Sequence, residues 1–183
     1  MDRRTGVVGL ATALVIALAG CSSKEGNGGT PSNSVVPAPS PSASLPLSVA
    51  AERDALVAYR GMWSAFVEAG KTSDPDAPDL RKYASDNALK LIVRSLYTDR
   101  DQGKVTKGPL RLDPKATESK PPDVPTEVKI LDCVDSTNWL EYKKSGELWD
   151  KEPGSKHRTT ATVKLTDGVW KVSSFILEGG ATC

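Results

Sequence analysis

The chain contains 183 residues, with 24 basic side chains, 23 acidic side chains and a formal net charge of +1. Residues 1–20 hold two of the basic side chains and one of the acidic ones, so the rest of the chain has 22 of each and is neutral. Nucleic-acid binding calls for a basic stripe, and no block of Lys and Arg is long enough to form one, so this composition excludes a nucleic-acid partner.

The first 20 residues are typical of a lipoprotein signal peptide. Charged residues 2–4 precede an apolar run over 6–19, which is shorter than the roughly 20 apolar residues of a membrane-spanning helix. Residues 18–21 resemble the lipobox of bacterial lipoproteins, in which a cysteine thiol is linked to diacylglycerol. We expect Cys21 to carry lipid, such as palmitate, that holds the protein at the extracytoplasmic face of the cell membrane. The alternative is a plain secretory signal in which Cys21 is incidental.

A tether is expected after this cysteine. Between residues 22 and 48, 16 of 27 residues are Gly, Pro or Ser, and such a segment buries too little apolar surface to offset its ordering entropy. We therefore expect the lipidated cysteine and a disordered tether over 21–47, and a single folded domain over 48–183.

Three helices are expected at the start of the folded domain. The first begins with Ser48 as N-cap and runs to about Ala69, and a short second helix follows. The third follows Ser85 and runs to about Asp101, with Gly103 as its C-terminal cap. The residues expected to be buried recur at helical spacing: Leu56, Tyr59, Trp63 and Phe66, then Leu80, Tyr83 and Ala84, then Leu89, Ile92, Val93 and Leu96.

Beyond Gly103 the apolar pattern alternates, which indicates strands. A bulged or edge strand is expected around Val105, Leu110 and Leu112. In the next strand, one face is expected to hold Val124, Val128, Ile130 and Val134, and the other Glu127, Lys129 and Cys133. Residues 139–144 are expected to pair with that strand.

The last hairpin is expected to turn at Asp167-Gly168, which favours a type I′ turn. Such a turn pairs Leu165 with Trp170, and Val163 with Val172. Helices followed by a meandering sheet predict an α+β domain, with N-terminal helices packed on a curved antiparallel sheet.

Cys133 and Cys183 remain as an even pair if Cys21 carries lipid. In an oxidising compartment the direct interpretation is a disulfide, which would close a loop of about 50 residues and stabilise the fold by about 4 kcal/mol. A metal site or a catalytic thiol is the alternative, although no further cysteine or histidine lies nearby in sequence.

The order of elements resembles the cone-shaped fold of the nuclear transport factor 2 (NTF2-like), SnoaL-like and cystatin-like proteins. More narrowly, the chain is similar to small secreted lipoproteins of actinobacteria. The matching residues are Tyr59, Trp63, Leu80, Tyr83-Ala84, Gly103-Lys104-Val105, Gly108, Asp132-Cys133-Val134-Asp135, Gly168-Val169-Trp170-Lys171-Val172 and Cys183. That family has no assigned activity, so the resemblance implies a compartment, a fold and a disulfide, and leaves the function open.

Asp132 is the polar residue whose expected position suggests chemistry. Strand alternation places it on the inward face with Ile130 and Val134, where burial raises a carboxyl pKa toward the range of an acid-base catalyst. A strand-end bulge that turns Asp132 outward is the alternative. Aromatic residues that could line a pocket with Asp132 are Tyr59, Trp63, Tyr97 and Trp170, although packing in the core is the first explanation for them.

The remaining candidates have weaker signals. His157, the only histidine, is expected in a solvated loop rather than as a general base. Trp149 is expected in a loop, where an exposed ring could contact a partner. No acidic array has the spacing of a calcium loop and no serine lies in a nucleophile elbow, so we expect neither a metal nor a cofactor.

The leading hypothesis is a non-catalytic, membrane-anchored binding or scaffold module of the cell envelope. Its expected partner is an envelope protein, a lipid or a cell-wall glycan. The alternative is a small-molecule pocket protein, or a weak isomerase or dehydratase of the SnoaL-like type, with Asp132 as the acid-base group. A packed interior favours the first hypothesis, whereas an open apolar cavity with converging polar groups favours the second.

Overall fold

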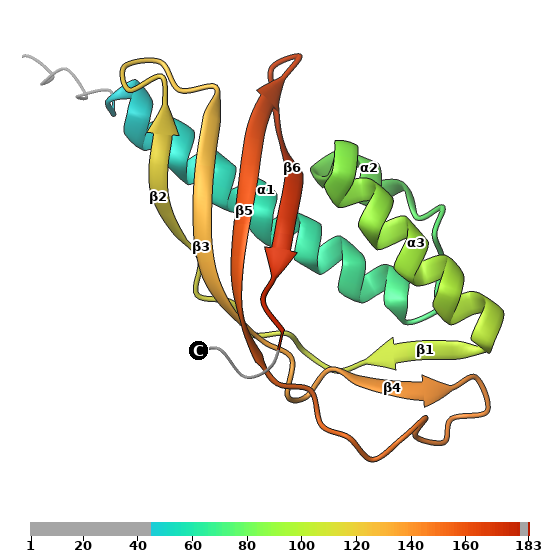
Figure 1. Cartoon of the computed structure of the whole chain (residues 1–183). Coiled ribbons are helices and arrows are strands. Elements are labelled where there is room, and N and C mark those ends of the chain that lie inside the picture. Colours follow the sequence, from blue (N-terminus) through green and yellow to red (C-terminus); the bar gives the residue numbers. More distant parts are fainter. Residues whose placement is uncertain (1–44, 180–182) are drawn as a thin grey trace, which may run out of the picture. The chain divides into compact units, whose positions relative to one another are not determined.

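The computed structural model describes residues 45–179 and residue 183. The predicted signal peptide, Cys21 and nearly all of the predicted tether lie outside these residues. Within them, three helices come first and six strands follow (Figure 1). Their bounds are α1 Leu47–Gly70, α2 Pro78–Tyr83, α3 Asp86–Gln102, β1 Lys104–Lys107, β2 Lys115–Lys120, β3 Glu127–Asp135, β4 Leu140–Lys143, β5 Lys156–Thr166 and β6 Val169–Leu177. In this part of the chain no helix combines the length and the apolar character needed to cross a membrane.

Helix α1 supplies the long apolar face on which the domain is built. Tyr59, Trp63 and Phe66 are buried as predicted, and Leu56 is half-buried at the edge of the same face. The ring of Trp63 packs against Phe175 of β6, with ring centroids 5.4 Å apart. The α1 stripe therefore joins the helices to the sheet.

The start of α1 differs from the prediction. The N-cap is Pro46 rather than Ser48, and no side chain caps the helix. The carbonyl of Pro46 accepts a hydrogen bond from the amide of Ala50 at 3.1 Å, which starts the helical ladder at Leu47. The prediction of Ser48 as N-cap was wrong because the restricted φ of proline already favours the extended conformation that precedes a helix.

Helix α3 ends as predicted. Gly103 adopts a left-handed φ of 71°, and its amide donates to the carbonyl of Arg100 at 3.1 Å. Ser85 occupies the N-cap position, but its hydroxyl donates to the carboxylate of Asp86 at 3.0 Å instead of accepting from a backbone amide. Both ends of α3 are therefore where the sequence placed them, with a different contact at the N-terminal end.

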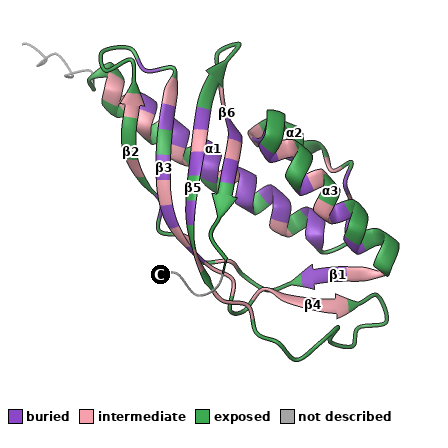
Figure 2. Cartoon of the chain, in the orientation of Figure 1, coloured by how far each residue is buried: buried purple, intermediate pink, exposed green. Residues whose placement is uncertain are grey.

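The main sheet has four antiparallel strands in the order β2-β3-β5-β6. Helix α1 lies across one face, and buried positions alternate along the strands that face it (Figure 2). On β3, the predicted alternation is confirmed: Val128, Ile130 and Val134 are buried, whereas Lys129 lies exposed on the other face. Extra residues in β2, at Thr117, and in β6, at Ser173, interrupt the register and add bends to the sheet. The α+β class, with helices followed by a curved antiparallel sheet, is confirmed.

The last hairpin also agrees with the prediction. Leu165 pairs with Trp170 and Val163 pairs with Val172. Asp167 and Gly168 have φ values of 51° and 75°, the two positive angles that a type I′ turn requires.

The predictions missed one strand and misplaced one residue of another. The strand β2 was not predicted, because Lys115–Lys120 is polar and charged, as suits an exposed edge strand. Val124 was placed on the inner face of β3, but it lies in the β2–β3 loop and is exposed. Pro125 follows it, and since proline has no amide hydrogen it cannot continue a strand ladder.

The partner of residues 139–144 was also predicted wrongly. Strand β4 pairs with β1 in a separate two-stranded sheet, with Val105 opposite Tyr142. Both edges of β3 are already occupied, one by β5 along its whole length and the other by β2. The expected strand around Val105 ends at Lys107, and Leu110 and Leu112 pack half-buried against the core outside any strand.

Candidate functional site

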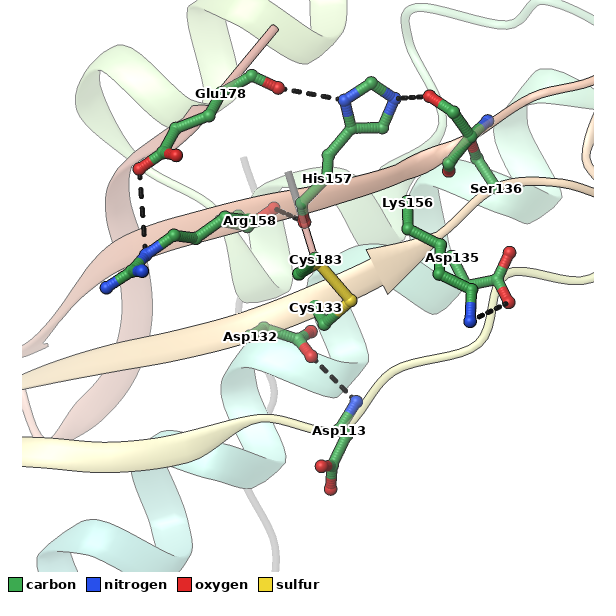
Figure 3. The surroundings of a disulfide bond; sticks show 12 residues. Asp113, Asp132, Cys133, Asp135, Ser136, Lys156, His157, Arg158, Glu178 and Cys183 are labelled. Atoms are coloured by element: carbon green, nitrogen blue, oxygen red, sulfur yellow. Dashed lines mark hydrogen bonds and ion pairs between the residues drawn. A yellow bond between two sulfur atoms is a disulfide. The ribbon is translucent and has the colours of Figure 1, made fainter. Parts of the chain in front are cut away.

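Cys133 and Cys183 form a disulfide with their Cα atoms 6.0 Å apart (Figure 3). The bond joins β3 to the C-terminal residue of the chain. The disulfide interpretation of this pair therefore agrees with the structure, whereas the lipidation of Cys21 concerns a residue outside the described part.

Asp132 lies on the inward face of β3 and is only 3 % exposed. Its Oδ1 atom accepts a hydrogen bond from the backbone amide of Asp113 at 2.7 Å (Figure 3). Burial raises the pKa of the Asp132 carboxyl above its ordinary value, and the hydrogen bond from Asp113 opposes this rise without cancelling it. The carboxyl group therefore points inward, as the strand alternation predicted.

Tyr59 lies beside Asp132, and Trp63 lies beside Tyr59 in the same buried region. Burial raises the pKa of the Tyr59 hydroxyl, and the negative charge of Asp132 raises it further. Tyr59 Oη, Trp63 Nε1 and Asp132 Oδ2 are buried polar atoms without a hydrogen-bond partner among the described residues. The three side chains make a polar inclusion within an otherwise apolar core.

The other two residues of the predicted pocket lie elsewhere. Tyr97 is 43 % exposed on α3, where the guanidinium of Arg100 lies 4.6 Å from its ring centroid. Trp170 is half-buried in the β5–β6 hairpin, opposite Leu165. The structure thus brings together Tyr59, Trp63 and Asp132, and leaves Tyr97 and Trp170 apart from them.

His157 was expected in a loop, but it is the second residue of β5. Its Nδ1 atom lies 2.9 Å from the carbonyl of Glu178, and its Nε2 atom lies 2.8 Å from the hydroxyl of Ser155. A carbonyl can only accept, so in the neutral ring Nδ1 donates to Glu178 and the Ser155 hydroxyl donates to Nε2. These bonds hold the segment after β6 against the start of β5, next to the disulfide.

A larger hollow lies where α3, β1 and β4 meet. This cleft has a volume of about 730 Å³, and its lining includes Asp150, Glu152, Pro153 and Gly154 from the β4–β5 loop. Its floor includes Phe66 and Trp139, whose rings meet edge to face with centroids 5.2 Å apart. A volume of this size falls within the range of about 300–1,000 Å³ that is common for small-molecule sites.

A charged cluster forms one wall of the cleft. Lys104 Nζ lies 2.9 Å from Glu141 Oε2 and 3.3 Å from Asp99 Oδ1. Burial lowers the pKa of Lys104, but the hydrogen bond and charge of Glu141 and the charge of Asp99 outweigh it, so the net shift is upward. Burial raises the pKa of Asp99, and the charge of Lys104 opposes this rise. Trp149 lies beside the cluster, with its ring centroid 5.6 Å from the ammonium of Lys104.

Two further polar atoms lie buried at the floor of the cleft. Thr106 Oγ1 and Trp139 Nε1 have no hydrogen-bond partner among the described residues. Both side chains approach Gly70 closely, where a Cβ atom would collide with the Thr106 hydroxyl. The absence of a side chain at position 70 therefore lets β1 pack against the end of α1.

The sequence did not indicate this cleft. Asp99, Lys104 and Glu141 are separated along the chain, and none of them carries a local motif. The only signal was Trp149, whose loop position was predicted and whose side chain is 39 % exposed. The residues meet because β4 pairs with β1, which is the pairing that sequence reasoning missed.

Among residues 45–179 and residue 183, no group of three or more His, Cys, Asp or Glu side chains is arranged to hold a metal ion. Two of the carboxylates in the cleft, those of Asp99 and Glu141, contact Lys104.

No protein-family model matches the chain, and no curated protein matches it. Among solved structures, the intermembrane space region of the chloroplast protein ARC6 is 13% identical, with a TM-score of 0.36 over 69% of this chain and 98% of that chain. A protein of unknown function with a cystatin-like fold from Nostoc punctiforme is 10% identical, with a TM-score of 0.38 over 69% of this chain and 93% of its own.

A further domain of unknown function with a cystatin-like fold, also from Nostoc punctiforme, is 12% identical. Its TM-score is 0.40, and the match covers 72% of this chain and 79% of that chain. Since these TM-scores are below 0.5, the fold assignment rests on the helices and strands described above.

Proposed function

We propose that the chain is a lipid-anchored protein of the cell envelope whose folded domain is a non-catalytic binding module, with the cleft beside α3 as its ligand site. The observation that carries the binding role is the cleft itself, which is large enough for a small ligand or for a side chain of a larger partner. The lipid anchor is inferred from residues 18–21.

The position of the cleft suits an anchored module. Phe66, near the C-terminal end of α1, lies in its floor, whereas the chain enters the domain at the N-terminal end of α1. A helix of 24 residues is about 36 Å long, so it separates the two ends of the domain by roughly that length. The cleft therefore lies far from the point at which the tether attaches.

The lining of the cleft indicates the chemistry of the ligand. Four carboxylates lie in it, against the two cations Arg94 and Lys104, and Lys104 is already paired with two of those carboxylates. Aromatic rings form the floor. We therefore propose a neutral or cationic ligand with an apolar face, a description that includes a cell-wall glycan or a side chain of an envelope protein.

Photo-crosslinking in intact cells tests the binding role. A photoreactive amino acid replaces Leu91, which lines the cleft and is 49% exposed, or Val57, a 60% exposed aliphatic residue of α1 that lies outside it. We expect a crosslinked product from position 91 that position 57 does not give. Identical products from the two positions would contradict a ligand in the cleft.

Mass spectrometry of the natural protein tests the anchor separately. We expect an N-terminus at Cys21 that carries a diacylglycerol group. An uncut N-terminus, or an unmodified Cys21, would remove the membrane part of the proposal and leave the cleft untouched.

Catalysis by Asp132 receives less support. Its carboxyl group is buried beside Tyr59, and the hollow that Asp132 lines, near the disulfide, measures about 190 Å³. This volume is below the range of ordinary substrate sites.

A further inference from the structure

One end of the folded domain carries exposed aliphatic side chains, and we call it the apolar end. It consists of the start of α1, the β2–β3 loop and the β5–β6 hairpin (Figure 1). Its members are Leu45, Leu47, Val49, Val124, Leu165 and Val169. Each of them is at least 36 % exposed, and Leu47 reaches 61 %. These side chains therefore present apolar surface to water at one end of the domain.

Hydrogen bonds hold the three segments of the apolar end together. The hydroxyl of Ser119, at the end of β2, donates to the carboxylate of Glu52 in α1 at 2.8 Å. The amide of Leu165, at the end of β5, donates to the carbonyl of Thr126 in the β2–β3 loop at 2.8 Å. The apolar end is thus a fixed surface and not a set of independent loops.

The lysines at the border of the apolar end are paired with carboxylates. Lys164 lies 3.7 Å from Glu127, and Lys120 lies 2.8 Å from Glu118. Asp123 and Asp167, in the two loops of this end, are exposed. A basic surface attracted to anionic lipid would need unpaired cations. Contact through this end would therefore depend on apolar surface and would persist at high salt.

The chain enters the domain at this same end. Leu45 is the first described residue, so residues 22–44 connect Cys21 directly to the apolar end. A tether makes any second contact with the membrane intramolecular, and a surface too weak to bind a membrane alone is then occupied for much of the time. Aliphatic side chains of this kind enter the boundary between lipid headgroups and acyl chains.

We propose that the apolar end rests on the surface of a phospholipid bilayer, and that the domain thereby holds its cleft outward. The inference depends on the proposed lipid anchor at Cys21. It goes beyond the anchor because the folded domain itself contacts the membrane and takes up one orientation. The opposite end of the domain, where the cleft lies, then faces the space beyond the membrane.

Trp170 provides a natural reporter of this contact. It lies half-buried in the β5–β6 hairpin, opposite Leu165 of the apolar end. The acylated natural protein is placed in vesicles of phosphatidylethanolamine and phosphatidylglycerol, part of whose acyl chains carry bromine. Bromine quenches tryptophan fluorescence on close approach, so a bilayer contact at the hairpin quenches Trp170.

Three variants of the acylated protein accompany the wild type. The first is Trp170→Phe, which removes the reporter. The second places charges on the apolar end through Leu47→Glu, Val124→Glu and Val169→Glu. The third is a matched control that places the same charges on exposed aliphatic residues elsewhere, through Val57→Glu, Leu148→Glu and Ile176→Glu. Circular dichroism checks that each variant is folded.

We expect bromine-dependent quenching of the wild type that survives high salt. It should fall at least twofold in Trp170→Phe and in the apolar-end variant, and stay unchanged in the matched control. Acylated wild type without quenching, or equal quenching with Trp170→Phe, overturns the inference while the anchor stands. An unmodified Cys21 in the mass spectrum overturns the anchor and the inference together. Should the apolar-end variant fail to fold, the Trp170→Phe comparison decides.

Discussion

Two aspartates of β3 show how the surroundings of a single residue set its pKa. Asp132 and Asp135 lie three positions apart on β3, yet their carboxyl groups meet opposite conditions. Burial raises the pKa of Asp132. Hydrogen bonds from the hydroxyl and the amide of Thr137 lower the pKa of Asp135. The amide nitrogen of Thr137 lies 3.0 Å from Asp135 Oδ1. The two residues should therefore affect stability with opposite dependence on pH.

Replacing Asp132 by Asn tests this directly. A carboxyl group whose pKa is raised by folding favours the folded state at low pH, and this contribution is lost as the pH rises through the folded pKa. We therefore expect Asp132→Asn to increase the free energy of unfolding at neutral pH relative to the wild type, and to lose this advantage in acid. Urea unfolding measured from acidic to neutral pH gives the comparison.

Asp135→Asn is the matched control. Because folding lowers the pKa of Asp135, its carboxylate stabilises the fold at neutral pH, and the effect disappears as the pH falls through the folded pKa. We expect this variant to be less stable than the wild type at neutral pH and equal to it in acid. The same pH profile for both variants would contradict the assignment of opposite pKa shifts.

At the scale of elements, α1 and α2 meet at a position without a side chain. A Cβ atom on Gly61 would lie 2.5 Å from Cδ1 of Tyr83, so the tyrosine ring lies directly on the backbone of α1. Glycine inside a helix is less favourable than alanine by about 1 kcal/mol. The packing of Tyr83 therefore outweighs a loss of helix stability at this site.

Gly61→Ala measures this balance. Overpacking costs about 1–3 kcal/mol, which exceeds the gain in helix propensity, so we expect the variant to be less stable by about 1 kcal/mol. In a Tyr83→Ala background the clash is absent, and the same substitution should stabilise the protein by up to about 1 kcal/mol. Denaturant unfolding of the wild type, the two single variants and the double variant gives a double-mutant cycle. An unchanged effect in the two backgrounds would show that Tyr83 does not set it.

The cluster at Lys104 links α3, β1 and β4. The side chains of Lys104 and Asp99 are 13% and 12% exposed, and that of Glu141 is 39% exposed. We expect Lys104→Met to destabilise the protein by about 3 kcal/mol, because it leaves two carboxylates facing each other without a cation. Lys143→Met is the matched control, since Lys143 and Glu147 form an exposed pair that should contribute about 0.5 kcal/mol. Thermal unfolding measures the stability that each variant loses. Similar losses in the two variants would show that burial does not strengthen the ion pairs of Lys104.

For the whole molecule, the disulfide is a covalent constraint between distant parts of the chain. It closes a loop of 50 residues, from the centre of the sheet to the C-terminal residue. On the chain-entropy argument, a loop of this length stabilises the folded state by about 4 kcal/mol. The bond also holds the segment after β6 near His157, which fastens the same segment to β5.

We expect Cys133→Ser with Cys183→Ser to lower the free energy of unfolding by about 4 kcal/mol. A reducing agent should bring the wild type to the same stability and leave the double variant unchanged. Urea unfolding with and without the reducing agent provides both measurements. A wild type that does not respond to reduction would show that the bond contributes little to folding.

Local features of this protein could be predicted from its sequence. The Asp167-Gly168 turn, the Gly103 cap and the apolar stripe of α1 depend on neighbouring residues, and the structure confirms each of them. The inward position of Asp132 followed from strand alternation alone. In each case the physical cause, a positive φ or a repeating side-chain direction, acts within a few residues.

Only the tertiary structure decided which distant segments meet. The pairing of β4 with β1, the polar edge strand β2 and the cleft around Lys104 join residues far apart in the chain. Strand pairing of this kind depends on which edge is free once the other strands are placed, and no single segment carries that information. The sequence by itself determined the helices, the last turn and the α+β class, whereas the site that we propose exists only because of long-range pairing.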